Sequence, residues 1–233
     1  MFKFLKNIMN NEEVNLTNDA YSLHRILKTD IKKDPNVEED EIIFGCGCFW
    51  GAEKCFWKLP GVVTTSVGYA GGEKNNPTYY EVCSGLTGHS EVVRVIWDKR
   101  EIDVSDLLKM FWECHDPTQK NRQGNDMGTQ YRSAIYYKNE NNFKTILASK
   151  EQYQTELSKN NLGLIETEIK MIDSYFYAEQ YHQQYLASAG SRQYCSASPT
   201  KVKLGVFIGS NYKLEDHIWE NFNWEVDKCV LRS

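Results

Sequence analysis

The chain changes character near residue 41, where a polar segment gives way to alternating apolar and polar runs. Residues 1–40 are rich in Asn, Lys and Glu, and only residues 21–28 are compatible with a short helix. Beyond residue 41, short β-branched and aromatic runs alternate with longer amphipathic stretches. We therefore expect a polar N-terminal extension (1–40), a folded domain (41–187) and a C-terminal tail (188–233).

The folded domain is expected to consist of short strands separated by amphipathic helices. Strands are predicted over 41–46, 62–69, 90–98, 131–137 and 165–172. Helices are predicted over 49–59, 106–114, 141–158 and 177–187. Ser105 is the expected N-cap of the second helix, and residues 119–128 are read as a polar loop.

The order of these elements predicts the fold class. Strand, helix, strand, strand, helix, strand is the split βαβ pattern of the ferredoxin-like two-layer α/β sandwich, an α+β fold. We expect this βαββαβ core with extra helices and an irregular C-terminal tail.

Composition narrows the class of protein. Hydrophobic residues make up 41% and charged residues 25%, so the chain can bury a core. A net charge of -5 without a basic run argues against a nucleic-acid partner. No stretch approaches the ~20 apolar residues of a membrane span. The 7 cysteines are odd in number and no secretory signal is evident, which favours a reducing compartment. We expect a cytoplasmic protein, with organelle targeting by the extension as the alternative.

The densest motif runs from Gly45 to Glu53, where a strand ends in glycines and a helix begins. Cys48 lies at the junction, so backbone N–H groups and the helix dipole favour its thiolate and predict a lowered pKa. Phe49 and Trp50 would give a pocket apolar walls. The alternative is an ordinary buried cysteine. Because Cys46-x-Cys48 has no second ligand pair, we predict no metal site.

Two further segments carry candidate chemistry. Glu91 opens an apolar strand, where burial would raise its pKa and keep it protonated as an acid; the alternative is a solvated strand end. Asp126 lies in a polar loop that leads into an aromatic strand and is either a binding residue or a turn residue. Cys114-His115-Asp116 looks like a triad, but neighbours in sequence rarely converge as one.

Together these motifs resemble the A-type peptide methionine sulfoxide reductases, which act on the S epimer of methionine sulfoxide. The signature is Gly47-Cys48-Phe49-Trp50-Gly51. The other matching segments are 66–72, 76–79, 81–85, 87–93, 115–119, 122–126, 128–133 and 178–185. The resemblance covers roughly residues 41–187, which would form the catalytic domain.

The resemblance implies a role for each site residue. Cys48 is the expected nucleophile, and Glu91 the expected proton donor to the sulfoxide oxygen. The remaining side chains would hold the substrate: its methyl group by Phe49 and Trp50, its oxygen by Tyr79 and Tyr131, and its orientation by Asp126. Cys48 would become a sulfenic acid, which a second thiol converts to a disulfide.

The resemblance further implies thioredoxin as the reductant and no cofactor; we also expect a monomer. Cys195 in the tail is our candidate for the resolving thiol, and Cys229 for a second recycling thiol. Cys46 is either a rival resolving thiol or, as we prefer, a packed core thiol. Two other functions stay open: a thiol hydrolase pairing Cys48 with a histidine such as His89, and a thiol-based redox sensor.

Overall fold

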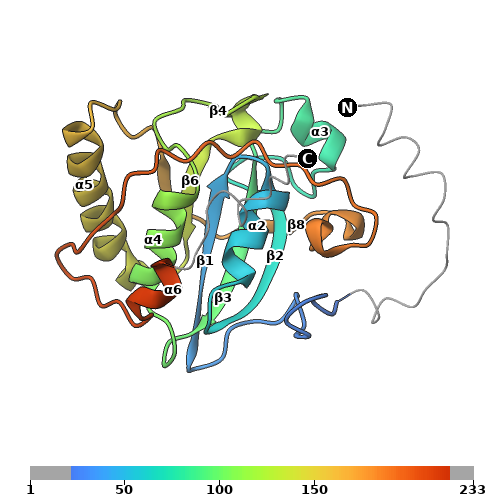
Figure 1. Cartoon of the computed structure of the whole chain (residues 1–233). Helices are drawn as coiled ribbons and strands as arrows, with labels where there is room; N and C mark the ends of the chain where they lie inside the picture. Colours follow the sequence, from blue (N-terminus) through green and yellow to red (C-terminus); the bar gives the residue numbers. More distant parts are fainter. Residues whose placement is uncertain (1–21, 221–233) are drawn as a thin grey trace.

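A mixed sheet forms the centre of the protein. The computed structural model describes residues 22–220 (Figure 1). Within this range the six-stranded sheet has the order β7-β6-β1-β3-β2-β8, and all neighbours are antiparallel except the parallel pair β6 and β7. The strands are β1 (Glu39–Cys46), β2 (Val62–Ala70), β3 (Ser90–Asp98), β6 (Ser133–Tyr137), β7 (Glu168–Met171) and β8 (Tyr175–Tyr177).

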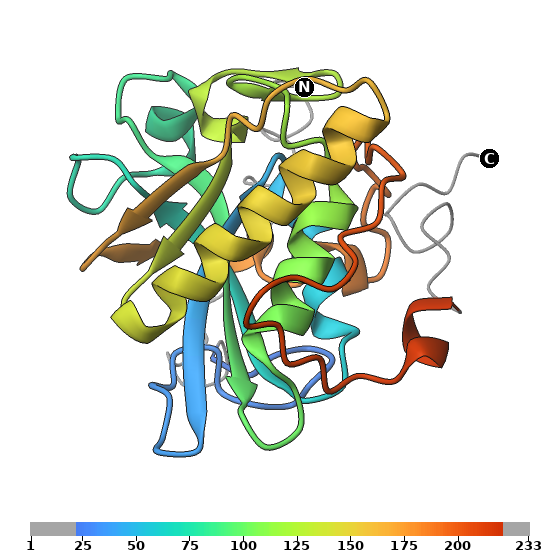
Figure 2. The same cartoon turned by 90° about the vertical axis from the view of Figure 1, so that its left-hand side faces the viewer.

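Three helices cover one face of the sheet, as Figures 1 and 2 show. They are α2 (Phe49–Trp57), α4 (Val104–Cys114) and α5 (Phe143–Lys159). Side chains alternate along β1: Phe44 enters the large core beneath the helices, and Ile43 enters a smaller cluster on the opposite face. Phe44 stacks on Phe56 of α2 at 4.8 Å and on Phe111 of α4 at 5.1 Å. The expectation of a layered α/β fold is therefore confirmed.

The predicted strands and the first three long helices are present, with shifted ends. Helix α4 begins earlier than expected, because Asp103 rather than Ser105 is its N-cap. The Asp103 carboxylate accepts hydrogen bonds from the backbone N–H and the hydroxyl of Ser105 at 2.9 and 2.7 Å. Ser105 is thus a first-turn residue that the cap holds in place.

The predicted helix over 177–187 is wrong. The segment consists of the end of β8 and two 3₁₀ turns, Gln180–His182 and Tyr185–Ala187. Gln183 uses its side chain to pair with both the N–H and the C=O of Val67. Gln184 has a left-handed backbone with φ 46°, which ends any helix. Tertiary hydrogen bonds to β2 therefore override the local helical pattern.

The helix suggested over 21–28 is also absent from the described part, residues 22–28. The His24 ring accepts the N–H groups of Ile26 and Leu27, which closes a single turn, and Lys28 then takes φ 60°. His24 and Ile31 are buried, so the second half of the extension is docked onto the domain.

Smaller differences surround the predicted polar loop. It contains a short hairpin of β4 (Arg122–Gln123) and β5 (Asp126–Met127). Tyr131 belongs to a 3₁₀ turn, Thr129–Tyr131, that precedes β6. A short helix that the sequence pattern did not predict, α3 (Tyr79–Cys83), begins at a capping box. Another 3₁₀ turn, Glu140–Asn142, leads into α5.

The C-terminal tail lacks regular structure over most of its described length, as predicted. Its last described residues form the short helix α6 (Asp216–Glu220). It is nevertheless firmly attached. Leu204 is fully buried and its N–H donates to Glu113 of α4 at 3.0 Å. The Asn211 N–H donates to the Ser105 hydroxyl at 3.0 Å. The tail therefore forms an outer layer over the helices, visible across the front of Figure 1.

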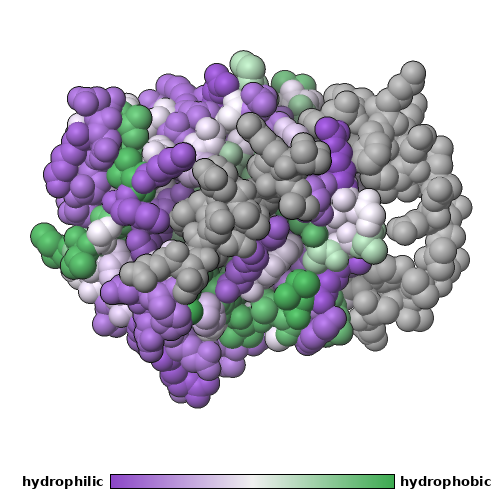
Figure 3. Space-filling view, viewed as in Figure 1, coloured by the Kyte–Doolittle hydropathy of each residue, from purple (hydrophilic) through white to green (hydrophobic). Residues whose placement is uncertain are grey.

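The surface of this face is mainly hydrophilic, with apolar side chains in separate patches (Figure 3). Over residues 22–220, no helix has both the length and the apolar composition that crossing a bilayer requires.

Replacing Phe44 by alanine tests the core. Because Phe44 is fully buried between two aromatic rings, Phe44→Ala should lower the free energy of unfolding by about 3–5 kcal/mol. Urea denaturation followed by circular dichroism measures this loss. Val37→Ala, at a position 87% exposed, is the control and should change stability by less than about 0.5 kcal/mol. Equal midpoints for the two variants would contradict the described core.

Candidate active site

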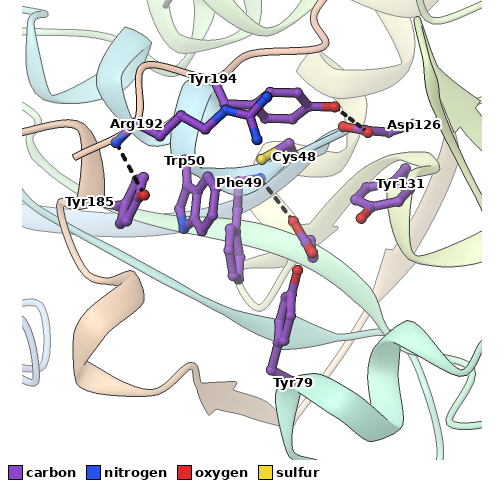
Figure 4. Close-up of a pocket in the computed structure, with 10 residues that line it drawn as sticks. Cys48, Phe49, Trp50, Tyr79, Asp126, Tyr131, Tyr185, Arg192 and Tyr194 are labelled. Atoms are coloured by element: carbon purple, nitrogen blue, oxygen red, sulfur yellow. Dashed lines mark hydrogen bonds between the residues drawn. The ribbon is translucent and has the colours of Figure 1, made fainter. Parts of the chain in front are cut away.

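An open pocket lies where β1 passes into α2, and ten side chains line it (Figure 4). They are Cys48, Phe49, Trp50, Tyr79, Glu91, Asp126, Tyr131, Tyr185, Arg192 and Tyr194. Seven of the ten are the nucleophile, acid and substrate-binding residues expected from the sequence. The fold thus brings together residues from α2, α3, β3, the hairpin and the tail.

Gly47 sets the position of Cys48. It has φ +89°, and a Cβ at this residue would lie 2.6 Å from the Gln123 side chain, so only glycine fits. Cys48 follows as the N-cap of α2, and its carbonyl accepts the Ala52 N–H at 3.4 Å. The thiol is therefore at the first turn of the helix, where Cys48 lines the pocket.

The expectation of a lowered pKa for Cys48 is wrong for the substrate-free protein. Burial raises the pKa of the thiol, and the negative charges of Glu91 and Asp126 raise it further. A hydrogen bond from the Trp50 N–H acts in the opposite direction but is outweighed. The helix terminus alone does not decide the charge, so the resting group is a thiol.

Glu91 is a buried acid next to this thiol. The side chain is 2% exposed, and one carboxyl oxygen accepts the Phe49 N–H at 3.1 Å. Burial raises the pKa of Glu91 to about 8, with a smaller contribution from Asp126, while the bond from Phe49 lowers it. Glu91 is thus mainly protonated at neutral pH, as its apolar strand suggested. In that form it no longer opposes ionisation of Cys48.

Two phenols face the same space. Burial, together with the charge of Glu91, raises the pKa of Tyr79 and of Tyr131, so both keep their protons and can donate. In Figure 4 the Tyr79 hydroxyl points toward the carboxyl group that Phe49 contacts. Glu179 fixes the start of α3 by accepting the Tyr79 N–H at 2.9 Å and the Tyr69 hydroxyl at 2.8 Å.

An aromatic wall closes the opposite side. The Trp50 ring stacks on Tyr185 with centroids 3.9 Å apart and planes 17° apart. The Trp50 indole N–H donates to His182 Nδ1 at 3.0 Å, and burial lowers the pKa of His182 to about 3, so the imidazole is neutral. Sequence reasoning assigned no role to Tyr185 or His182. The aromatic content of segment 178–185 could have pointed to these two residues, but we had assigned the segment to a helix.

The tail covers the pocket mouth. The Tyr194 hydroxyl donates to Asp126 Oδ1 at 2.5 Å, and the Arg192 N–H donates to the Tyr185 hydroxyl at 3.3 Å. Asp126 Oδ2 is buried and has no hydrogen-bond partner among the described residues. One acceptor in the pocket is therefore available to a ligand. Arg192 and Tyr194 are pocket residues that sequence reasoning did not single out.

The candidate resolving thiols have different surroundings. Cys195 does not line the pocket but follows Tyr194, packs in a cluster with Trp57 and Tyr185, and adds to the raised pKa of Cys48. Cys46 is buried in the large core, which agrees with the expected packed core thiol. Cys229 lies outside the described residues.

A possible metal site near Cys46 does not fit a metal ion. Donor atoms of Cys46, Cys114 and His115 lie within 4.8 Å of one another. Both His115 nitrogens are already used: Nδ1 donates to the Phe111 carbonyl at 2.8 Å, and Nε2 pairs with the Ser133 hydroxyl at 2.7 Å. The imidazole therefore has no free lone pair for a metal, and the group is better described as core packing.

His89, the histidine that a thiol hydrolase would pair with Cys48, lies outside the pocket. His89 Nδ1 accepts the Gly72 N–H at 3.1 Å and its Nε2 donates to the Lys74 carbonyl at 2.7 Å. Both nitrogens hold a loop, and His89 does not line the pocket. The structure therefore gives no support to a Cys48–His89 pair.

The raised pKa of Glu91 predicts a pH-dependent stability change. The folded state holds this proton more tightly than the unfolded state, whose value is near 4.5, so stability falls as pH rises from there through about 8. Glu91→Gln removes this loss. The variant should match the natural protein at about pH 5 and exceed it by a few kcal/mol at about pH 9. Urea midpoints at both pH values measure the gap, and a gap independent of pH would contradict the assignment.

The family model described as peptide methionine sulfoxide reductase matches residues 40–211. Peptide methionine sulfoxide reductase MsrA of Vibrio vulnificus is 53% identical over 180 residues, which cover 77% of this chain and 86% of the relative. The protein of the same name from Azotobacter vinelandii is 57% identical over 164 residues, covering 70% and 76%.

Solved structures agree with the sequence relatives. Methionine sulfoxide reductase A of Corynebacterium diphtheriae has a TM-score of 0.63 at 44% identity, covering 70% of this chain and 79% of that one. Reduced Mxr1 of Saccharomyces cerevisiae has a TM-score of 0.66 at 33% identity, covering 72% and 95%. The chain therefore belongs to the peptide methionine sulfoxide reductase family.

Proposed function

We propose that this protein reduces methionine S-sulfoxide, free or in proteins, to methionine, and so repairs oxidative damage. The family carries this activity in its name. The observation that carries the proposal is the meeting of one thiol, one protonated carboxyl group and two phenols in a pocket with aromatic walls. A sulfoxide needs these groups, since its sulfur is electrophilic and its oxygen leaves only when protonated.

In the first step the sulfoxide oxygen lies among Glu91, Tyr79 and Tyr131, with the methyl group against Phe49 and Trp50. The Cys48 sulfur attacks the substrate sulfur while Glu91 protonates the oxygen. The oxygen is then transferred to Cys48, the substrate S–O bond breaks, and methionine leaves. The thiol proton restores Glu91, so one thiol and one sulfoxide give one sulfenic acid and one thioether.

Asp126 supplies the remaining substrate contact in this proposal. Its Oδ2 atom is buried without a partner in the described part of the chain, so it suits a backbone or amino N–H group of the bound residue. The Tyr194 hydroxyl on Oδ1 holds the carboxylate in place.

In the second step we propose that the Cys195 thiol attacks the Cys48 sulfenic acid, forming a disulfide and releasing water. Cys195 follows the pocket residue Tyr194, and its charge contributes to the raised pKa of Cys48, so the two thiols lie near each other. A thioredoxin dithiol then reduces this disulfide to two thiols. Cys229 is proposed as a second recycling thiol.

Several wider expectations also remain proposals. A ferredoxin-like core is supported by the neighbouring order β6-β1-β3-β2, in which β3 separates β1 from β2. The division at residues 40 and 187 and a monomeric state are proposed on the sequence alone. A cytoplasmic location is likewise proposed on the sequence alone, from its odd number of cysteines.

Cysteine variants test the chemistry. Cys48→Ser should abolish reduction of a methionine S-sulfoxide peptide by dithiothreitol. Cys195→Ser should complete one turnover and then stall with thioredoxin. Peptide mass spectrometry of the natural protein after one turnover should show a Cys48–Cys195 disulfide. Full thioredoxin-driven turnover by Cys195→Ser would remove Cys195 from the mechanism, and a disulfide to Cys46 or Cys229 would reassign its role.

Acid catalysis is tested by Glu91→Gln, which keeps the bond from the Phe49 N–H but removes the proton. The turnover number should fall by about 10²–10³-fold. Steady-state kinetics with a peptide sulfoxide measures the loss, and Glu113→Gln, at a buried carboxyl on α4, is the control. If the protein were only a redox sensor, peroxide would oxidise Cys48 in the natural protein, in Glu91→Gln and in Glu113→Gln. None of the three would then reduce the sulfoxide.

A further inference from the structure

Glu53 is a buried carboxyl group that the proposed chemistry does not use. It lies on α2, is 0% exposed and does not line the pocket. Three donors surround it: the Thr65 hydroxyl at 3.0 Å, the Gln184 N–H at 2.8 Å and the Gln184 side-chain amide at 2.6 Å. A buried acid with this many donors requires an explanation.

The hydrogen bonds around Glu53 all run in one direction. His24 Nδ1 accepts the N–H groups of Ile26 and Leu27, so its Nε2 carries the proton and donates to the Thr65 hydroxyl at 2.8 Å. The Thr65 hydroxyl is thereby free to donate to Glu53. Burial lowers the pKa of His24 to about 4, so the ring stays neutral. The network thus satisfies an ionised Glu53 and leaves no described acceptor for a protonated one.

Glu53 holds a strained turn of the backbone at Gln184. Gln184 has φ 46°, a left-handed conformation that is costly for a residue with a side chain. Glu53 accepts hydrogen bonds from both the backbone N–H and the side-chain amide of Gln184. The side-chain carbonyl of Gln184 in turn accepts the Arg25 N–H at 3.4 Å. The next residue, Tyr185, is the ring that stacks on Trp50 in Figure 4.

We propose that Glu53 is a positioning residue that holds Gln184 and thereby places the Tyr185–Trp50 wall against the substrate. The docked segment 22–31 completes this support through His24. The proposal rests on the proposed function for its kinetic readout, but it assigns Glu53 no chemical step. It predicts an effect on substrate binding rather than on turnover.

The ionisation of Glu53 provides a specific readout. Burial raises its pKa to about 7, while Gln184, Thr65 and the charge of Arg25 act to lower it. The other titratable groups facing it are the neutral His24 and the buried Tyr175 hydroxyl. As pH rises through this range, an ionised Glu53 accepts its donors more strongly and orders the wall. Glutamine cannot ionise, so Glu53→Gln should behave like the protonated natural protein.

The experiment compares KM values of Glu53→Gln and the natural protein between pH 6 and pH 8. The ratio of the two KM values should rise from about twofold to about tenfold, with kcat within about twofold. Taking the ratio cancels the titrations of Glu91 and Cys48, which both proteins share. Glu113→Gln, the same change at another buried acid, should give a ratio near one throughout. A constant ratio, or a loss confined to kcat, would overturn the proposal.

A second variant keeps the test decisive if Glu53→Gln folds poorly. Thr65→Val removes one donor to the carboxylate, so the pH midpoint of its KM profile should move upward relative to the natural protein. An unchanged midpoint would overturn the proposal. If the natural protein itself reduces no sulfoxide, the proposed function fails instead, and the two failures are distinguishable.

Discussion

The hydrogen bond from the Phe49 N–H to the buried Glu91 carboxyl is the contact on which the site depends. It joins the first turn of α2 to the start of β3, and it places an acid beside the thiol of Cys48. The chain brings these residues together across 42 positions because β1 and β3 are neighbours in the sheet. The helix terminus thus contacts a carboxyl group that can carry a proton, rather than a permanent anion.

This arrangement makes the charges of Cys48 and Glu91 depend on each other. With Glu91 ionised, the thiol is harder to ionise; with Glu91 protonated, that opposition disappears. In the proposed reaction the proton leaves Glu91 as the sulfur attacks, so both groups change together. Burial of an acid is unfavourable for folding above its normal pKa, and the protein accepts this cost where the chemistry needs it.

The pocket walls depend on segments far from the reacting atoms. The tail fixes Asp126 through Tyr194 and covers the mouth, and Gln184 carries Tyr185 against Trp50. Segment 22–31 reaches the same wall through His24 and Thr65. Segment 22–31 and the described part of the tail, residues 188–220, thus pack against the domain from outside the sheet. Strand β3 holds the acid and the start of α2 holds the thiol, while less regular segments shape the space around the substrate.

The resemblance to a known family, carried by motifs such as residues 47–51, supplied the roles of seven of the ten pocket residues. The sequence pattern alone predicted the strands and the first three long helices, because hydrophobic periodicity acts over a few residues. It failed over 177–187, where side-chain bonds from Gln183 and Gln184 to other elements replace the helical ones. It also failed for the charge of Cys48, since neither the burial of the thiol nor its distance to Glu91 is a local property. The backbone of residues 177–187 and the charge of Cys48 follow from the tertiary structure, because hydrogen-bond competition and desolvation depend on which distant residues the fold makes neighbours.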